Sequence, residues 1–161
     1  MHFCLKCALY ILKSKGFIML DIQTKELVKS TIPALKSQGE DITKVFYREL
    51  FTRYPQVKGM FDMQKQKDGS QPKALAMAVL NAAKNIDNLE KIRPSIESIG
   101  KTHVRLNVRP EHYPLVGECL LVAIKEVLGA SDEVLEAWSK AYGEIAEFYI
   151  DIEKKIYQEQ K

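Results

Sequence analysis

An otherwise aliphatic helical stripe carries one imidazole, that of His103. Ile92, Ile96, Ile99, His103 and Leu106 recur at steps of three and four residues, so they share one face of a helix. A buried neutral imidazole must satisfy two ring nitrogens, one as a donor and one as an acceptor. His103 is therefore either a core histidine bonded to backbone or a metal ligand. This stretch on its own favours the core histidine.

Tyr47, Gln71 and Glu153 also fall where helical spacing predicts apolar surface. Each has an ordinary explanation, respectively a core tyrosine that reaches solvent, a residue that begins a helix, and a solvated residue at a frayed end. Glu153, however, is in line with Tyr142 and Tyr149 on the inner face of the last predicted helix, and a buried carboxylate needs a partner. A cofactor bound at His103 gives these polar groups a common purpose.

Helical periodicity dominates the chain after Met19, and strand patterns are nearly absent. The polar segment from Asp62 to Ser70 is predicted to be a mobile loop. About six or seven helices of unequal length predict an irregular all-α globule. We expect them from Asp21 to Gly39 with a kink at Pro33, from Asp41 to Tyr54, from Pro72 to near Asn88, from Pro94 past His103, from Pro114 to Leu128, and from Ser131 to Ile156.

Composition limits the class of protein. A chain of 161 residues, 46% of them hydrophobic, is long enough for one domain with a sizeable core. Three of the 24 basic residues and none of the 21 acidic residues lie in residues 1–18, so the remainder is balanced and predicts no nucleic-acid binding. The eight glycines are never closer together than ten residues, which excludes glycine-rich nucleotide loops.

The leading segment, residues 1–18, does not follow the helical pattern. Its Cys4 and Cys7 form a CxxC pair, but Ala8 follows where covalent haem attachment requires histidine. We interpret Met19 as the start of the domain and the extension as a start-site artefact or a poorly ordered arm. No segment is long and apolar enough to span a membrane. One isolated cysteine in the body, Cys119, suits a reducing, cytoplasmic compartment.

The order of landmarks along the chain resembles the globin domain of bacterial flavohaemoglobins, and more closely their single-domain relatives of the Vitreoscilla type. The likeness covers Met19 to about Gln158. It implies a globin fold over residues 19–161, with about six to eight helices around a pocket for noncovalent haem b. The landmarks are Tyr47, "GMFDM" with Phe61, "QPKALAM" with Gln71 and Leu75, "THV" with His103, "EHYPLVGECLL" with Tyr113, "EAWSKAYG", and Glu153.

The resemblance also implies roles for individual residues. His103 would be the proximal iron ligand, with Tyr113 and Glu153 as the hydrogen-bond partners that fix its tautomer. On the distal side, the hydroxyl of Tyr47 and the amide of Gln71 would face dioxygen. The apolar contacts with the porphyrin and the distal wall would come from Phe61, Leu75 and Val79.

Two positions depart from the family pattern. Many flavohaemoglobins have lysine directly before the proximal histidine, whereas Thr102 stands there in this chain. Pro72 directly follows Gln71, and proline restrains the preceding residue away from helical geometry. We therefore expect Gln71 at the mouth of a helix, beside the mobile loop, where it can swing out of the pocket. We expect His112 to be exposed at a helix start.

The ligands implied by the resemblance are dioxygen and nitric oxide, and three activities are compatible with them. The enzymatic one is dioxygenation of nitric oxide to nitrate, which consumes an electron in each turnover and so requires a separate electron-donating reductase. The alternatives are a dioxygen storage or delivery carrier that supports respiration, and a gas sensor, for which no output segment is recognisable. Whether the chain is an enzyme therefore stays open. We expect a monomer or homodimer.

Overall fold

The computed structural model describes residues 20–161, and the predicted extension over residues 1–18 lies outside the described residues. Helices alone form the regular structure of this part, which confirms the all-α prediction, and none is long and apolar enough to cross a membrane. They are α2 (Ile22–Ser30), α3 (Ile32–Arg53), the 3₁₀ helix η1 (Pro55–Met60), α4 (Met63–Lys67), α5 (Ser70–Lys84), the 3₁₀ helix η2 (Leu89–Ile92), α6 (Arg93–Arg105), α7 (His112–Leu128) and α8 (Asp132–Glu159).

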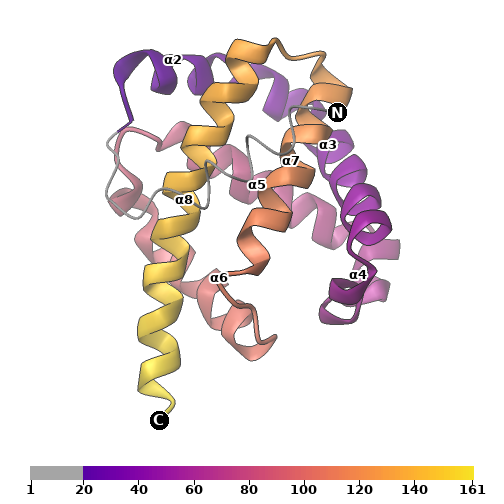
Figure 1. Ribbon diagram of the computed structural model, residues 1–161, viewed down its shortest axis with the longest axis vertical. Helices are drawn as coiled ribbons and strands as arrows, with labels where there is room; N and C mark the ends of the chain where they lie inside the picture. The colour runs from indigo at the N-terminus through magenta and orange to yellow at the C-terminus, as the bar shows by residue number, and fades with distance from the viewer. Residues whose placement is uncertain (1–19) are drawn as a thin grey trace.

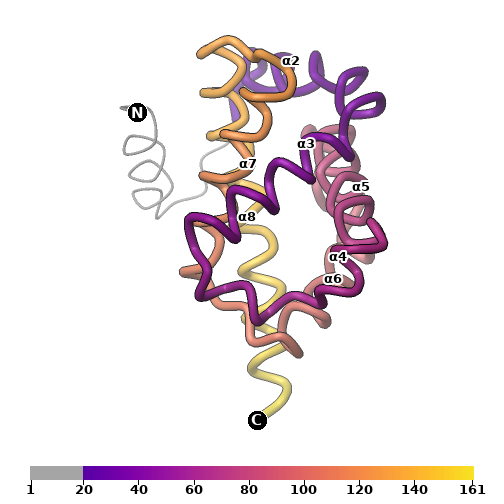
Figure 2. The backbone as a smooth tube through the Cα atoms, turned by 90° about the vertical axis from the view of Figure 1, so that its right-hand side faces the viewer, coloured from indigo at the N-terminus to yellow at the C-terminus, as the bar shows by residue number. Residues whose placement is uncertain are grey.

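The helices pack as two groups, one around α3 and one around α8, and both groups include α7. α3 lies between α5 and α7 and packs against both (Figure 2). α8 runs along the long axis, packs against α2, α6 and α7, and its C-terminal end projects past the other helices (Figure 1). Because α7 touches both α3 and α8, it joins the two groups.

Caps determine several of the helix ends. The Asp21 side chain accepts from the Thr24 backbone N–H at 2.7 Å, and the Ser131 hydroxyl accepts from Val134 N–H at 3.3 Å, as expected of N-caps. Gly129, with φ of 58°, ends α7 in the left-handed conformation that glycine adopts most easily. These predicted boundaries are confirmed.

The predicted break between Gly39 and Asp41 is wrong, because α3 continues without interruption from Ile32 to Arg53. Pro33 lies in the first turn of α3, where its missing N–H leaves no hydrogen bond unmade, so it starts this helix instead of kinking the previous one. A Cβ at Gly39 would stand 3.3 Å from the Cβ of Ala76 on α5. Gly39 is therefore required for close helix packing and does not act as a terminator.

The predicted mobile loop over residues 62–70 is also wrong, since its polar residues cap a helix. Asp62 accepts from Gln64 N–H at 2.9 Å and starts α4, while Asp68 accepts from Ser70 N–H at 2.8 Å. Gly69, with φ of 81°, turns the chain directly into α5. At its other end α5 stops at Lys84, before the predicted boundary near Asn88.

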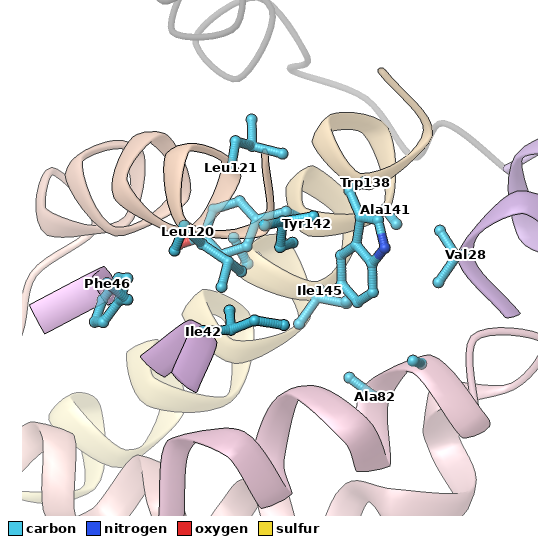
Figure 3. Packing of buried hydrophobic residues seen from close by; sticks show 14 of the residues in the cluster. Val28, Ile42, Phe46, Ala82, Leu120, Leu121, Trp138, Ala141, Tyr142 and Ile145 are labelled. Atoms are coloured by element: carbon cyan, nitrogen blue, oxygen red, sulfur yellow. The ribbon is translucent and has the colours of Figure 1, made fainter. Parts of the chain in front are cut away.

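The core surrounds Trp138, which is 1% exposed and donates from its indole nitrogen to the Thr31 hydroxyl at 3.1 Å. This bond joins α8 to the α2–α3 corner and satisfies the one polar atom of the indole. Ile42 of α3, Leu120 of α7 and Ile145 of α8 belong to the same buried cluster (Figure 3).

Gly100 generates a prediction about the contact between α6 and α8. A Cβ at Gly100 would stand 3.3 Å from Ile156 Cδ1 and 3.4 Å from Glu153 Cγ, whereas one at Gly143 meets nothing within 4 Å. We expect Gly100→Val to lower the free energy of unfolding by about 1–3 kcal/mol, a typical overpacking cost. Gly143→Val should change it by less than about 0.5 kcal/mol. Urea denaturation of both variants measures the difference, and equal values would refute tight packing at Gly100.

Candidate haem site

A cavity of about 390 Å³ opens between α3, α5, α6, α7 and α8, with walls that are mostly apolar. Residues from distant parts of the sequence meet there. Glu153 lies behind one wall, in hydrogen-bond contact with His103. Seven of the eight residues predicted from the sequence line the cavity itself, namely Tyr47, Phe61, Gln71, Leu75, Val79, His103 and Tyr113.

His103 lies near the C-terminal end of α6, and its two ring nitrogens have different surroundings. Nδ1 is 2.6 Å from Glu153 Oε1 and 3.3 Å from the Tyr113 hydroxyl. In the neutral imidazole, a hydrogen on Nδ1 donated to this carboxyl oxygen leaves Nε2, across the ring, with a free lone pair. This neutral tautomer with Nε2 unprotonated is the one that ligates a metal.

Glu153 is the buried charged centre of this cluster, with only 5% of its side chain exposed. It accepts from the Tyr113 hydroxyl at 2.6 Å as well as from His103. Burial raises the pKa of Tyr113, and the adjacent Glu153 raises it further, so the tyrosine stays protonated as a donor. The two donors compensate the cost of removing the carboxylate from water.

Further hydrogen bonds hold the elements that carry this cluster. The Tyr142 hydroxyl of α8 donates to the Tyr113 carbonyl at 2.6 Å, which fixes the start of α7 against α8. One helical turn beyond Glu153, the Tyr157 hydroxyl donates to the Val108 carbonyl at 2.6 Å and anchors the connection between α6 and α7. The ring of Tyr149 lies 6.1 Å from that of His103, and burial raises the Tyr149 pKa to about 12.

The opposite wall of the cavity is an aromatic cluster around Tyr47 on α3. The Tyr47 ring makes edge contacts with Phe46 at 4.9 Å and Phe61 at 5.6 Å, measured between centroids. Tyr47 is 7% exposed, and burial raises the pKa of its hydroxyl, which therefore remains a hydrogen donor. Leu75 and Val79 on α5 continue the wall as apolar surface.

Gln71 lies at the mouth of α5, as predicted, but within its first helical turn. It is the second residue of α5, and Pro72 follows in the first turn, where proline leaves no intrahelical bond unmade. The Thr43 hydroxyl of α3 donates to the Pro72 carbonyl at 2.8 Å and fixes this end of α5 to α3. Gln71 lines the cavity, and its Oε1 accepts from Gln66 Nε2 at 2.9 Å.

Two polar residues near the cavity were missed from the sequence. Gln66 lies in the polar segment that was predicted to be a loop, where no helical spacing of apolar residues distinguishes it from its neighbours. His112 was expected to be exposed, but it is half-buried and lines the cavity. Its Nδ1 accepts a hydrogen bond from Arg109 N–H at 2.9 Å. Of the two residues before His103, Thr102 lines the cavity and Lys101 is exposed.

The donor set of the cavity fits a haem. Among residues 20–161, no group of three or more His, Cys, Asp or Glu side chains is arranged to hold a metal ion. A metal beside His103 therefore needs further ligands, which the four nitrogens of a porphyrin supply. A flat apolar macrocycle also matches the apolar walls, and one imidazole with a carboxylate partner is a common axial ligand.

Comparison with known proteins agrees with this geometry. The model of the globin family, described simply as Globin, matches residues 44–148. The chain belongs to the globin family. The matched range begins just before Tyr47 on α3, includes His103 and Tyr113, and ends within α8.

Two of the similar proteins are a bacterial flavohaemoprotein and a bacterial globin of known structure. The chain is 50% identical over 150 residues to a flavohaemoprotein of Oceanobacillus iheyensis, a match that covers 92% of the chain and 37% of that relative. This globin thus spans little more than a third of that curated relative. A bacterial globin structure from Campylobacter jejuni is 53% identical, with a TM-score of 0.84, and the match covers 86% of this chain and 99% of that one.

A third relative carries a named activity. It is an engineered carbene transferase made from a candidate nitric oxide dioxygenase of Rhodothermus marinus. Its structure is 37% identical to this globin, with a TM-score of 0.80, and the match covers 86% of this chain and 96% of that one.

The Glu153 cluster generates a stability prediction. Tyr113→Phe removes one donor from a buried carboxylate, so the free energy of unfolding should fall by about 1–3 kcal/mol. In a Glu153→Gln background the same change should cost less, because a neutral amide needs the donor less. Urea denaturation of the two single variants and the double variant gives the coupling energy. Additive losses would show that the hydroxyl and the carboxylate do not depend on one another.

Proposed function

We propose that this globin holds haem b noncovalently through His103 and dioxygenates nitric oxide to nitrate, with a separate protein as its reductase. In this proposal it is a single-domain counterpart of the flavohaemoglobins, of the Vitreoscilla type. The haem iron, when bound, supplies the centre at which dioxygen and nitric oxide react. The protein contributes an electron-donating proximal ligand, a polar distal side and apolar walls.

The observation that carries the proposal is the contact of 2.6 Å between His103 Nδ1 and Glu153 Oε1. A carboxylate that accepts from one imidazole nitrogen increases the basicity of the other. With haem bound, stronger donation from Nε2 would make the iron more electron-rich, the proximal contribution that suits reaction of dioxygen with nitric oxide. Reversible storage of dioxygen needs only a neutral imidazole, so this buried carboxylate favours the enzyme over the carrier.

The distal residues supply complementary hydrogens. Tyr47 and Gln71 line the same cavity as His103 but lie on α3 and α5, opposite α6. In the proposal their O–H and N–H groups stabilise negative charge that develops on dioxygen, in an apolar surrounding where such bonds act strongly. Leu75 and Val79 keep this side largely free of water.

The reaction requires an electron source. Nitric oxide, dioxygen and one electron balance to one nitrate ion, so each turnover needs one electron. The likeness to the flavohaemoprotein of Oceanobacillus iheyensis supports a flavin-dependent source for that electron. The likeness to the Rhodothermus marinus protein supports nitric oxide as the substrate.

The proximal ligand is tested by His103→Ala. We expect the purified variant to lose the five-coordinate ferrous spectrum and most of its haem, since Nε2 of His103 is the proposed protein ligand of the iron. Added imidazole should partly restore the spectrum by filling the space left by the side chain. Absorption spectroscopy and haem quantification measure both effects. An unchanged spectrum would return His103 to the role of a core histidine.

Glu153→Gln separates the enzyme from the carrier. We expect the variant to retain haem, to have a higher ferric/ferrous potential, and to form nitrate about 10–100-fold more slowly, the usual range for loss of a ligand's hydrogen-bond partner. Dioxygen affinity should change less. Redox titration and nitrate analysis, with a supplied reductase, measure these quantities.

Glu147→Gln is the matched control, because Glu147 is exposed on the same helix. It should leave both the potential and the nitrate rate unchanged. If Glu153→Gln behaves like this control, the carboxylate has no part in the chemistry and a dioxygen carrier becomes the better assignment.

A further inference from the structure

Gln66 makes an unusual contact for a residue outside the cavity lining. It lies half-buried on α4, and its Nε2 donates to Oε1 of Gln71 at 2.9 Å. Hydrogen bonding from the same side chain lowers the pKa of Tyr47, against the larger increase caused by burial. One amide therefore contacts both polar groups of the distal wall.

The bond to Gln71 determines which end of that amide is available to the cavity. A glutamine side chain has one oxygen that accepts and one nitrogen that donates two hydrogens. Because Gln66 occupies the oxygen of Gln71, the NH₂ group of Gln71 remains for a ligand. If Gln66 could not donate, the Gln71 amide would be free to rotate and present its oxygen instead.

The backbone around Gln66 is held firmly enough for such a role. Asp62 caps the start of α4, and Asp68 caps the turn that follows it. The Thr43 hydroxyl fixes Pro72, next to Gln71, to α3, one helical turn before Tyr47. The three side chains are therefore carried by segments that are bonded to one another.

We propose that Gln66 is a positioning residue that orients the NH₂ group of Gln71 toward the cavity. Gln71 then offers a donor to a bound ligand, and it favours dioxygen, which accepts strongly when bound, over carbon monoxide, which accepts weakly. This inference rests on the haem binding of the proposed function. It does not depend on nitric oxide being the substrate.

The test compares Gln66→Glu and Gln66→Met with Gln64→Glu in the haem-loaded protein. A carboxylate at position 66 accepts and cannot donate, so it should reverse the Gln71 amide, whereas methionine should only release it. Gln64 is exposed on the same short helix and controls for added charge. The measurements are dioxygen and carbon monoxide dissociation rates and the Fe–CO stretching frequency of the carbon monoxide complex.

We expect Gln66→Glu to speed dioxygen release about tenfold, roughly the effect of losing one hydrogen bond. Carbon monoxide release should change less than about threefold, since weak acceptors gain little from donors. The Fe–CO frequency should fall, as positive potential around the ligand is replaced by negative potential. Gln66→Met should have a smaller effect in the same direction, and Gln64→Glu none.

Introducing Gln66→Met into a Gln71→Leu variant tests the route of the effect, because the oriented amide is then absent. We expect no further change in dioxygen release. The proposal is overturned if the Gln66 variants match Gln64→Glu, or if the effect of Gln66→Met persists in that background. If the variants behave as described but the wild-type protein forms no nitrate, only the dioxygenase assignment is refuted. A wild-type protein that takes up no haem would overturn both.

Discussion

A single buried carboxylate constrains most of the architecture on one side of the cavity. Glu153 is compensated only when α6 supplies the His103 N–H and α7 supplies the Tyr113 hydroxyl. Three helices must therefore meet at one oxygen atom. The lack of a side chain at Gly100 lets α6 come close enough to α8 for this meeting. The interaction that prepares the imidazole for a metal thus also aligns the helices that carry it.

The distal side is organised by neutral hydrogen bonds and aromatic packing. Thr43 and Tyr47 lie one turn apart on α3, so the helix that presents the phenol also holds the start of α5 in place. Edge contacts between Tyr47, Phe46 and Phe61 restrict the phenol further. Because the carboxyl of Glu153 lies behind one wall and neutral polar groups lie on the other, the proposed function assigns electron donation and ligand stabilisation to different elements.

Much of this arrangement was predictable from the sequence, because long helices repeat their apolar positions many times. The stripe through His103 and the inner face with Glu153 gave strong signals, and the order of landmarks predicted which residues would line one cavity. Short-range features were harder. Pro33 was expected to kink the first helix, although in the first turn of α3 it costs no hydrogen bond. Gln66 had no periodic signal, since α4 contains only five residues.

The division of the helices into two bonded halves has a consequence for how such a protein can change over time. Tyr47 and Gln71 belong to a unit of α3, α4 and α5 tied together by Thr43 and Gln66, whereas His103, Tyr113 and Glu153 belong to a unit of α6, α7 and α8. Under the proposed function, substitutions in the first unit would alter how long a gas molecule stays, while those in the second would alter how readily electrons reach it. Natural selection can therefore adjust residence time and redox behaviour separately, and one scaffold can move between carrier and catalyst by small steps.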